Sequence, residues 1–264
     1  MKIETFSCSQ RGSRAENQDK TGHYLGEHAA CFVLCDGVAG DEGGARAASL
    51  ACHFMLRHAS QGKPCPPQDA PALIDQLQQV MQQAQSRESS RMRTTLVTLF
   101  IDRQSQQAHW IHAGDSRLYL FRNGYICQAT RDHSLAQKMR DAGFQQGTAP
   151  DNLLYCALGD DTTSPSFSST LDLSDGDAFL LCSDGFWQRY NVAMLEHTLR
   201  LSQSPQEWLM LIENLSSAQP SADNYSAIAV WVGSPQEATL LQMLPLDEHL
   251  IMPPSSSTDS GDTP

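Results

Sequence analysis

The sequence of 264 residues carries a formal net charge of −12, from 18 Lys and Arg against 30 Asp and Glu. This charge disfavours nucleic acid as a partner, because phosphate backbones are bound by basic surfaces. The sequence contains no run of about 18 apolar residues, the length that a membrane helix needs, and residues 1–9 do not resemble a secretory signal. We therefore expect a cytoplasmic, monomeric protein that does not insert into a membrane.

The eight cysteines show no CxxC spacing, and most of them lie in apolar segments. Paired CxxC motifs are typical of zinc sites and redox-active dithiols. An isolated thiol in an apolar segment instead packs as a small hydrophobic side chain. We therefore expect free and largely buried cysteines, with neither a disulfide framework nor a zinc site.

Apolar runs and polar turns indicate three strands and two helices in the first half of the chain. In chain order, these are strands 3–9, 20–25 and 30–35 and helices 40–59 and 72–86. The first helix is opened by Gly-Asp-Glu-Gly-Gly. Asp41 and Glu42 would therefore lie in its first turn, where the helix dipole favours acidic side chains.

Short strands return in the second half of the chain. The expected elements are strands 94–101, 108–113, 117–121 and 125–130, helix 134–142, strand 179–182, helices 192–199 and 205–217, and strand 227–232. Asn123-Gly124 predicts a tight hairpin between two of these strands. Residues 144–167 are small, polar and irregular in pattern, which is typical of a mobile segment.

The order of these elements bears on fold class and domain organisation. Strands in two blocks, with helices between and after them, indicate an α+β or layered α/β/β/α fold rather than regular alternation of strand and helix. We expect one domain over residues 1–235 and a C-terminal extension over 236–252. Residues 253–264 have no apolar side chain other than proline, which predicts a disordered tail.

Five aspartates end or closely follow apolar runs that are spread over most of the chain. They are Asp19, Asp36, Asp115, Asp184 and Asp223. A single aspartate at a strand end is usually a turn former or a helix cap, but a buried carboxylate is costly unless a cation meets it. With only 18 Lys and Arg in the chain, a shared site for divalent metal ions is the better interpretation of the set.

Eight short motifs surround these aspartates and follow one another in a distinctive order. They are RAENQD (14–19), CDGVAGDEGG (35–44), RTTL (93–96), GDSRLY (114–119), RDHS (131–134), ALG (157–159), CSDGFW (182–187) and DNYSAIAV (223–230). In type and order they resemble those of the metal-dependent PPM (type 2C) Ser/Thr protein phosphatases, and the compact chain is similar to the bacterial branch. The resemblance implies a central antiparallel β-sandwich flanked by helices on both sides, with a short flap at about residues 144–167.

The resemblance also implies an activity and a metal centre. The protein would hydrolyse phosphoserine and phosphothreonine in other proteins, as a signalling enzyme that reverses a bacterial Ser/Thr kinase. Two Mn²⁺ or Mg²⁺ ions about 3.5–4 Å apart would activate a bridging water, and such hard ions prefer oxygen ligands. Asp36 would bridge both ions, with the carbonyl of Gly37 on one ion and with Asp184 and Asp223 on the other.

Further positions of the motifs imply supporting roles. Asp19 would act close to the ions, directly or through water, and Asp115 would help to hold a third ion. Arg14 would bind the substrate phosphate, for which a planar and permanently charged guanidinium is well suited. Ser183 and Asn224 flank two of the ligand aspartates, and we expect them to orient these ligands.

One departure from the family pattern concerns the general acid. Many eukaryotic members carry a histidine directly after the Asp-Gly pair, whereas this chain has Val38. No other side chain is an obvious substitute, so either a metal-bound water would protonate the leaving group or a Ser or Thr alkoxide near the metal ions would need little protonation. His133, the histidine within a family motif, is expected to form structural hydrogen bonds rather than to act in catalysis.

Three alternative functions are open to test from the sequence. A haloacid-dehalogenase-type phosphatase needs an Asp-x-Asp pair directly after a buried strand, but residues 175–177 precede theirs. A calcium-binding structural module needs a DxDxDG loop with a distal Glu, which the sequence lacks. A catalytically weak regulatory binding module on the phosphatase fold is the main alternative, although such modules normally lose ligand aspartates and this chain keeps all five.

Overall fold

The computed structural model describes residues 1–62, 65–144, 153–160, 165–170, 172–215 and 221–235. Within these ranges the chain forms ten strands and six helices. The strands build two antiparallel five-stranded sheets, which we call sheet A and sheet B. The predicted C-terminal extension (236–252) and tail (253–264) lie outside the described residues.

Each sheet combines strands from distant parts of the sequence. Sheet A has the order β1 (Ile3–Gln10), β10 (Tyr225–Val232), β9 (Ala178–Cys182), β6 (Arg117–Arg122) and β7 (Tyr125–Ala129). Sheet B has the order β2 (Asp19–Leu25), β3 (Ala29–Asp36), β4 (Leu96–Asp102), β5 (Gln107–Ala113) and β8 (Ser166–Thr170). The pairing of β1 with β10 brings the first and the last of these strands together at one edge of sheet A.

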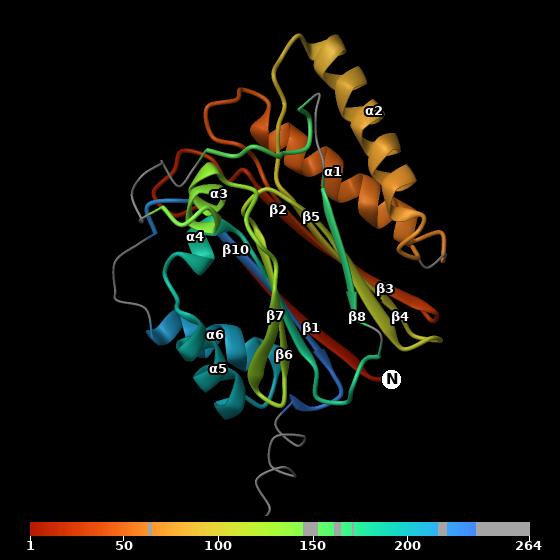
Figure 1. Ribbon diagram of the computed structural model, residues 1–264, viewed down its shortest axis with the longest axis vertical. Coiled ribbons are helices and arrows are strands. Elements are labelled where there is room, and N and C mark those ends of the chain that lie inside the picture. Colours follow the sequence, from red (N-terminus) through yellow and green to blue (C-terminus); the bar gives the residue numbers. More distant parts are fainter. Residues whose placement is uncertain (63–64, 145–152, 161–164, 171, 216–220, 236–264) are drawn as a thin grey trace, which may run out of the picture.

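Helices cover the outer face of each sheet (Figure 1). The helices are α1 (Gly44–Ala59) and α2 (Ala70–Glu88) on sheet B, α5 (Val192–Leu201) and α6 (Pro205–Leu215) on sheet A, and the short α3 (Leu135–Asp141) and α4 (Asp184–Trp187) near one end of the sandwich. No helix in the described part of the chain is both long and apolar enough to span a bilayer. The predicted α/β/β/α sandwich is therefore confirmed.

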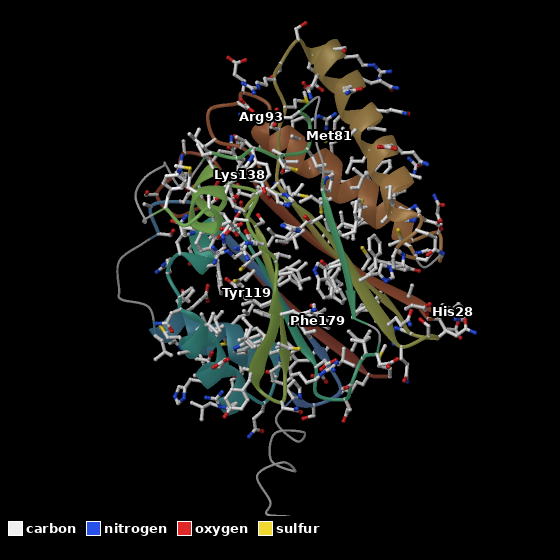
Figure 2. All side chains as sticks on the ribbon, viewed as in Figure 1. His28, Met81, Arg93, Tyr119, Lys138 and Phe179 are labelled. Carbon is white, nitrogen blue, oxygen red and sulfur yellow. The ribbon has the colours of Figure 1, made fainter. Side chains whose placement is uncertain are left out.

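The hydrophobic core has three layers, one between the sheets and one under each pair of helices. Strand β9 contributes side chains to two of these layers. Phe179 and Leu181 point into the space between the sheets, while Ala178 and Leu180 face the helices, because successive side chains of a strand point to opposite faces. Figure 2 shows Phe179 in the middle of the molecule, where side chains of the two sheets meet.

The predicted strands and helices are found with small shifts at their ends. The Asn123-Gly124 hairpin is confirmed, since both residues have positive φ, 55° and 76°, as a two-residue turn of this kind requires. The cysteines are free and largely buried, as predicted, since six of the eight are buried. Two short elements, β8 and α4, were not predicted.

Strand β8 begins inside the segment that was expected to be irregular. Its sequence, SFSST, has no apolar alternation that would predict a strand. It forms because the backbone of β5 offers a free edge, with which Phe167 pairs opposite Ile111. Residues 145–152 and 161–164 of the predicted flap lie outside the described residues.

The start of α1 also differs from the prediction. The helix begins at Gly44, so Asp41 and Glu42 precede it, and its first turn has no acidic residue. The Arg93 guanidinium, which lies near the start of α1 in Figure 2, binds the Asp41 carboxylate, with an Nε to Oδ2 distance of 2.7 Å. This ion pair, rather than the helix dipole, accounts for the position of Asp41.

One end of the sandwich collects the turns that contain the five motif aspartates. Asp19 opens β2 directly opposite Asp36, the last residue of β3. Asp115 follows β5, Asp184 follows β9, and Asp223 precedes β10. Since all these strand ends lie at the same end of the sandwich, the fold brings the five carboxylates towards one region.

The buried ion pair of Arg122 and Asp177 offers a test of the packing of sheet A. Asp177 is fully buried, and both of its oxygens accept hydrogen bonds from the guanidinium, at 2.7 and 2.8 Å. Arg122→Met leaves this carboxylate buried without its cation, so we expect the free energy of unfolding in urea to fall by about 3 kcal/mol.

Arg131→Met is the matched control, because Arg131 and its partner Asp141 are both exposed, so water and salt screen the pair and its loss should change stability far less. Equal losses in the two variants would contradict the special role of the buried pair.

Candidate active site

A pocket of about 410 Å³ opens at the end of the sandwich where the aspartate turns meet. Seven of the predicted site residues line it, namely Arg14, Asp36, Gly37, Asp115, Asp184, Asp223 and Asn224. The other two predicted residues, Asp19 and Ser183, are buried beneath it. The structure therefore gathers all nine of them in one region.

Asp36 is fixed through its backbone by the RTTL motif. Its N–H donates to the Thr95 hydroxyl at 3.0 Å, and its carbonyl accepts from the Thr95 N–H at 2.8 Å and from the Thr94 hydroxyl at 2.9 Å. All polar groups of the Asp36 backbone are thus bound by one neighbouring segment, which leaves the carboxylate at the pocket wall. The sequence pattern alone made these threonines look like ordinary strand residues.

Gly37 must be glycine for steric reasons. A Cβ atom at this position would lie 2.5 Å from the Gly44 carbonyl carbon, in the first turn of α1. The backbone of the Asp-Gly turn is therefore packed directly against the start of the helix. This close approach holds the Gly37 carbonyl, a predicted metal ligand, at the edge of the pocket.

Asp19 is 2% exposed and is held by neutral hydroxyl groups. Its Oδ2 accepts hydrogen bonds from Ser183 at 2.9 Å and from Ser226 at 2.7 Å. Its Oδ1 is buried and has no hydrogen-bond partner among the described residues. Ser183 thus orients Asp19 rather than its sequence neighbour Asp184, and Ser226 is a site residue that the sequence prediction missed although it belongs to the DNYS motif.

Arg14 reaches the pocket from the loop between β1 and β2. Its Nη2 donates to Oδ2 of Asp223 at 2.6 Å. Asn224 fastens this loop, since its Oδ1 accepts from the Gln18 N–H and its Nδ2 donates to the Glu16 carbonyl, both at 2.9 Å. Asn224 was expected to orient a ligand aspartate, and its backbone N–H does donate to Oδ1 of Asp223 at 2.8 Å, while its side chain holds the loop that carries Arg14.

The carboxylates of the pocket raise one another's pKa values. Burial and then the charges of Asp19, Asp184 and Asp115 raise the pKa of Asp36 well above its ordinary value. Burial and Asp223 raise the pKa of Asp184 to about 6. Burial and Asp184 raise the pKa of Asp115 to about 7. The ionised cluster is therefore unfavourable unless protons or cations join it.

These residues fit a group of hard divalent cations. The donors are carboxylate and carbonyl oxygens, and Asp19 Oδ1 is a buried acceptor that lacks a partner in the described structure. No three His, Cys, Asp or Glu side chains of the described residues are already arranged around a common point as metal ligands.

Comparison with known proteins places the chain in a family. The family model for protein phosphatase 2C matches residues 7–221. The chain belongs to the protein phosphatase 2C family. It is 29% identical over 184 residues to the protein phosphatase PhpP of Streptococcus pneumoniae, a match that covers 65% of this chain and 74% of PhpP. The expected membership in a family of Ser/Thr protein phosphatases is confirmed.

Solved structures of this phosphatase family agree with the fold. PppA, a key regulatory component of T6SS in Pseudomonas aeruginosa, is 29% identical and has a TM-score of 0.69, with 87% of this chain and 97% of PppA covered. The catalytic domain of the Ser/Thr protein phosphatase PstP, in complex with two manganese ions, is 26% identical and has a TM-score of 0.73, with 88% of this chain and 98% of that domain covered.

The raised pKa of Asp115 predicts a pH-dependent stability in chelator. A group whose pKa is higher in the folded state stabilises the fold at low pH, and this contribution is lost as pH rises towards the folded pKa, here about 7. Asp115→Asn cannot titrate. We therefore expect the melting temperature of the variant, relative to the original protein in EDTA, to rise by about 5 °C between pH 5 and pH 7.5.

Two nearby histidines do not disturb this comparison. Burial lowers the pKa values of His112 and His133, but both residues are present in both proteins and their effects cancel in the difference. Differential scanning fluorimetry is a suitable measurement. A difference that stays constant over this pH range would contradict the buried and crowded state of Asp115.

Proposed function

We propose that the protein is a metal-dependent phosphatase that hydrolyses phosphoserine and phosphothreonine in proteins. The observation that carries this proposal is the pocket wall, where Arg14 lies beside Asp36, Asp115, Asp184 and Asp223 in a chain of the protein phosphatase 2C family. A phosphomonoester resists hydrolysis in water, so a site for it must supply both positive charge and an activated water.

The proposed ligands follow the family pattern residue by residue. Asp36 would bridge two Mn²⁺ or Mg²⁺ ions, the Gly37 carbonyl would bind one of them, and Asp184 and Asp223 would bind the other. Asp19 would act through water or directly, and Asp115 would hold a third ion. When bound, such ions polarise the phosphoryl oxygens and lower the pKa of a water that can act as nucleophile. The relative PstP, which contains two manganese ions, supports this assignment.

The chain's own contribution is to bind the phosphate and to hold the carboxylates. Arg14 is half exposed and stands at the pocket wall, where its guanidinium can form a two-pronged contact with a phosphate. Its present partner, Asp223, is also a proposed metal ligand, so metal binding and phosphate binding are linked at this ion pair. Gln18 and Asn224 keep the Arg14 loop in place.

Protonation of the leaving group falls to water in this proposal. No histidine, lysine or cysteine is among the described residues that line the pocket, and Val38 lies where a histidine would be. His133 instead accepts a hydrogen bond from the Gly114 N–H and stacks on His112 with ring centroids 4.2 Å apart. These contacts support the structural role expected for it.

The biological setting is proposed from the relatives. We infer a bacterial, cytoplasmic signalling enzyme whose substrates are phosphorylated by a cognate Ser/Thr kinase. PhpP supports the activity, and PppA, with its stated role in T6SS, supports a regulatory setting. The alternative of a catalytically weak binding module is disfavoured, because all five motif aspartates are present.

The test of the proposed function is phosphate release from phosphoserine and phosphothreonine peptides. We expect turnover with Mn²⁺ and none after metal stripping in excess chelator. Asp36→Asn should lower kcat by at least about 10³-fold, because it disturbs both proposed ions and their shared water.

Turnover that survives chelation would contradict the metal dependence, and near-normal kcat in Asp36→Asn would contradict the bridging role. A protein that binds Mn²⁺ and phosphopeptide but never releases phosphate would favour the binding-module alternative.

Arg14→Ala should separate phosphate binding from metal binding. Loss of a charged hydrogen bond predicts a KM that is higher by about 10- to 100-fold, while the Mn²⁺ affinity measured by calorimetry stays the same or rises as Asp223 loses its cation.

Arg11→Ala is the matched control on the same loop, because Arg11 is exposed and, among the described residues, its side chain hydrogen-bonds the Ala15 carbonyl alone, at 3.3 Å. A large loss of Mn²⁺ affinity in Arg14→Ala would refute its role as a phosphate ligand.

A further inference from the structure

Trp187 joins two of the aspartate turns. It is the last residue of α4, three residues after Asp184, and its indole Nε1 donates a hydrogen bond to the backbone carbonyl of Asp115 at 2.8 Å. Asp184 follows strand β9 of sheet A, and Asp115 lies in the short turn that leaves β5 of sheet B and enters β6 of sheet A, the strand that pairs with β9. One side chain therefore ties the turn before β6 to the turn after β9.

The indole ring is itself held in place by Arg117. The guanidinium carbon of Arg117 lies 3.4 Å from the ring centroid of Trp187, in a stacked cation–π contact. Arg117 cannot easily turn away, because its Nε and Nη2 each donate to the buried carboxylate of Asp132 at 2.7 Å and its Nη1 donates to the Tyr119 hydroxyl at 3.1 Å. These contacts thus use polar residues of three motifs, and the proposed mechanism gives none of these residues a role.

The residues on either side of Asp115 are also restrained, and the Ser116 hydroxyl shares a hydrogen bond of 2.7 Å with the Thr95 hydroxyl. Gly114 adopts φ +102°, and its carbonyl accepts the His133 N–H at 2.8 Å. That bond acts one residue before Asp115, whereas the Trp187 bond acts on Asp115 itself. Freeing the Asp115 carbonyl would let the carboxylate move away from Asp184, whose charge raises its pKa.

We propose that Trp187 is a positioning residue that sets Asp115 against Asp184 for cation binding, with Arg117 as its brace. This inference rests on the proposed metal centre. Groups that orient metal ligands change affinity strongly when they are lost, and a backbone hydrogen bond restrains Asp115 without neutralising its charge. Because Asp36, Asp184 and Asp223 do not depend on this bond, the site that includes Asp115 is the one affected.

The experiment compares Mn²⁺ binding by titration calorimetry in the full chain. Trp187→Phe keeps an aromatic ring against Arg117 but removes the N–H donor. A second variant carries β-(3-benzothienyl)alanine at position 187, which keeps the size of indole and lacks only the donor. Trp208→Phe is the control, since its buried N–H bonds the Leu195 carbonyl in the helical layer.

In both position-187 variants we expect the weakest Mn²⁺-binding step to lose affinity by about tenfold or more, while the tighter steps change by less than about threefold. The value of kcat should fall with little change in KM, because the phosphate-binding loop is untouched. The control should lower the melting temperature and leave the Mn²⁺ isotherm unchanged.

Unchanged Mn²⁺ binding in the benzothienyl variant would overturn the inference and leave the proposed function intact. Equal weakening of all Mn²⁺ steps would also overturn it, because Trp187 would then support the whole site and not Asp115. If the original protein binds no Mn²⁺, the proposed function fails and the inference fails with it.

Discussion

Repulsion among buried carboxylates governs one end of this molecule. Asp36 is surrounded by the charges of Asp19, Asp184 and Asp115, which together with burial raise its pKa well above the ordinary value. Such an arrangement costs stability in the absence of a counter-charge. The large, well-packed core of the two sheets stabilises the fold and can offset this loss of stability. The turns at the end of the sandwich can therefore carry a cluster of carboxylates.

The site is held together mainly by neutral donors. Ser183 and Ser226 bind Asp19, Thr95 binds the backbone of Asp36, and Trp187 binds the backbone of Asp115. These groups fix position without cancelling negative charge, so the attraction for a cation remains. In the described part of the chain, Arg14 is the cationic side chain that hydrogen-bonds to one of the pocket carboxylates. From this position its guanidinium can release the Asp223 carboxylate and bind a substrate phosphate in its place.

The pattern of the strands made much of the fold predictable. In β9, apolar residues on both faces predict a strand that is buried on both sides, and Phe179 and Leu180 indeed enter different core layers. Strand β8 could not be predicted, because its serine-rich sequence forms a strand only where β5 provides an edge. The first turn of α1 was placed wrongly because Arg93 competes for Asp41, and local sequence does not reveal that partner.

The sequence by itself predicted most of the residues that the structure gathers at the pocket, because the motifs fix side-chain types at strand ends, although it missed Ser226. Only the tertiary structure decided how these residues are connected. Arg14 meets Asp223, and Asn224 meets Gln18, across more than 200 positions because β1 pairs with β10. The bond from Trp187 to Asp115 likewise depends on the pairing of β6 with β9, strands that are distant in the sequence. Long-range pairing and sheet packing are set by the buried area of the whole chain, and no local pattern encodes them.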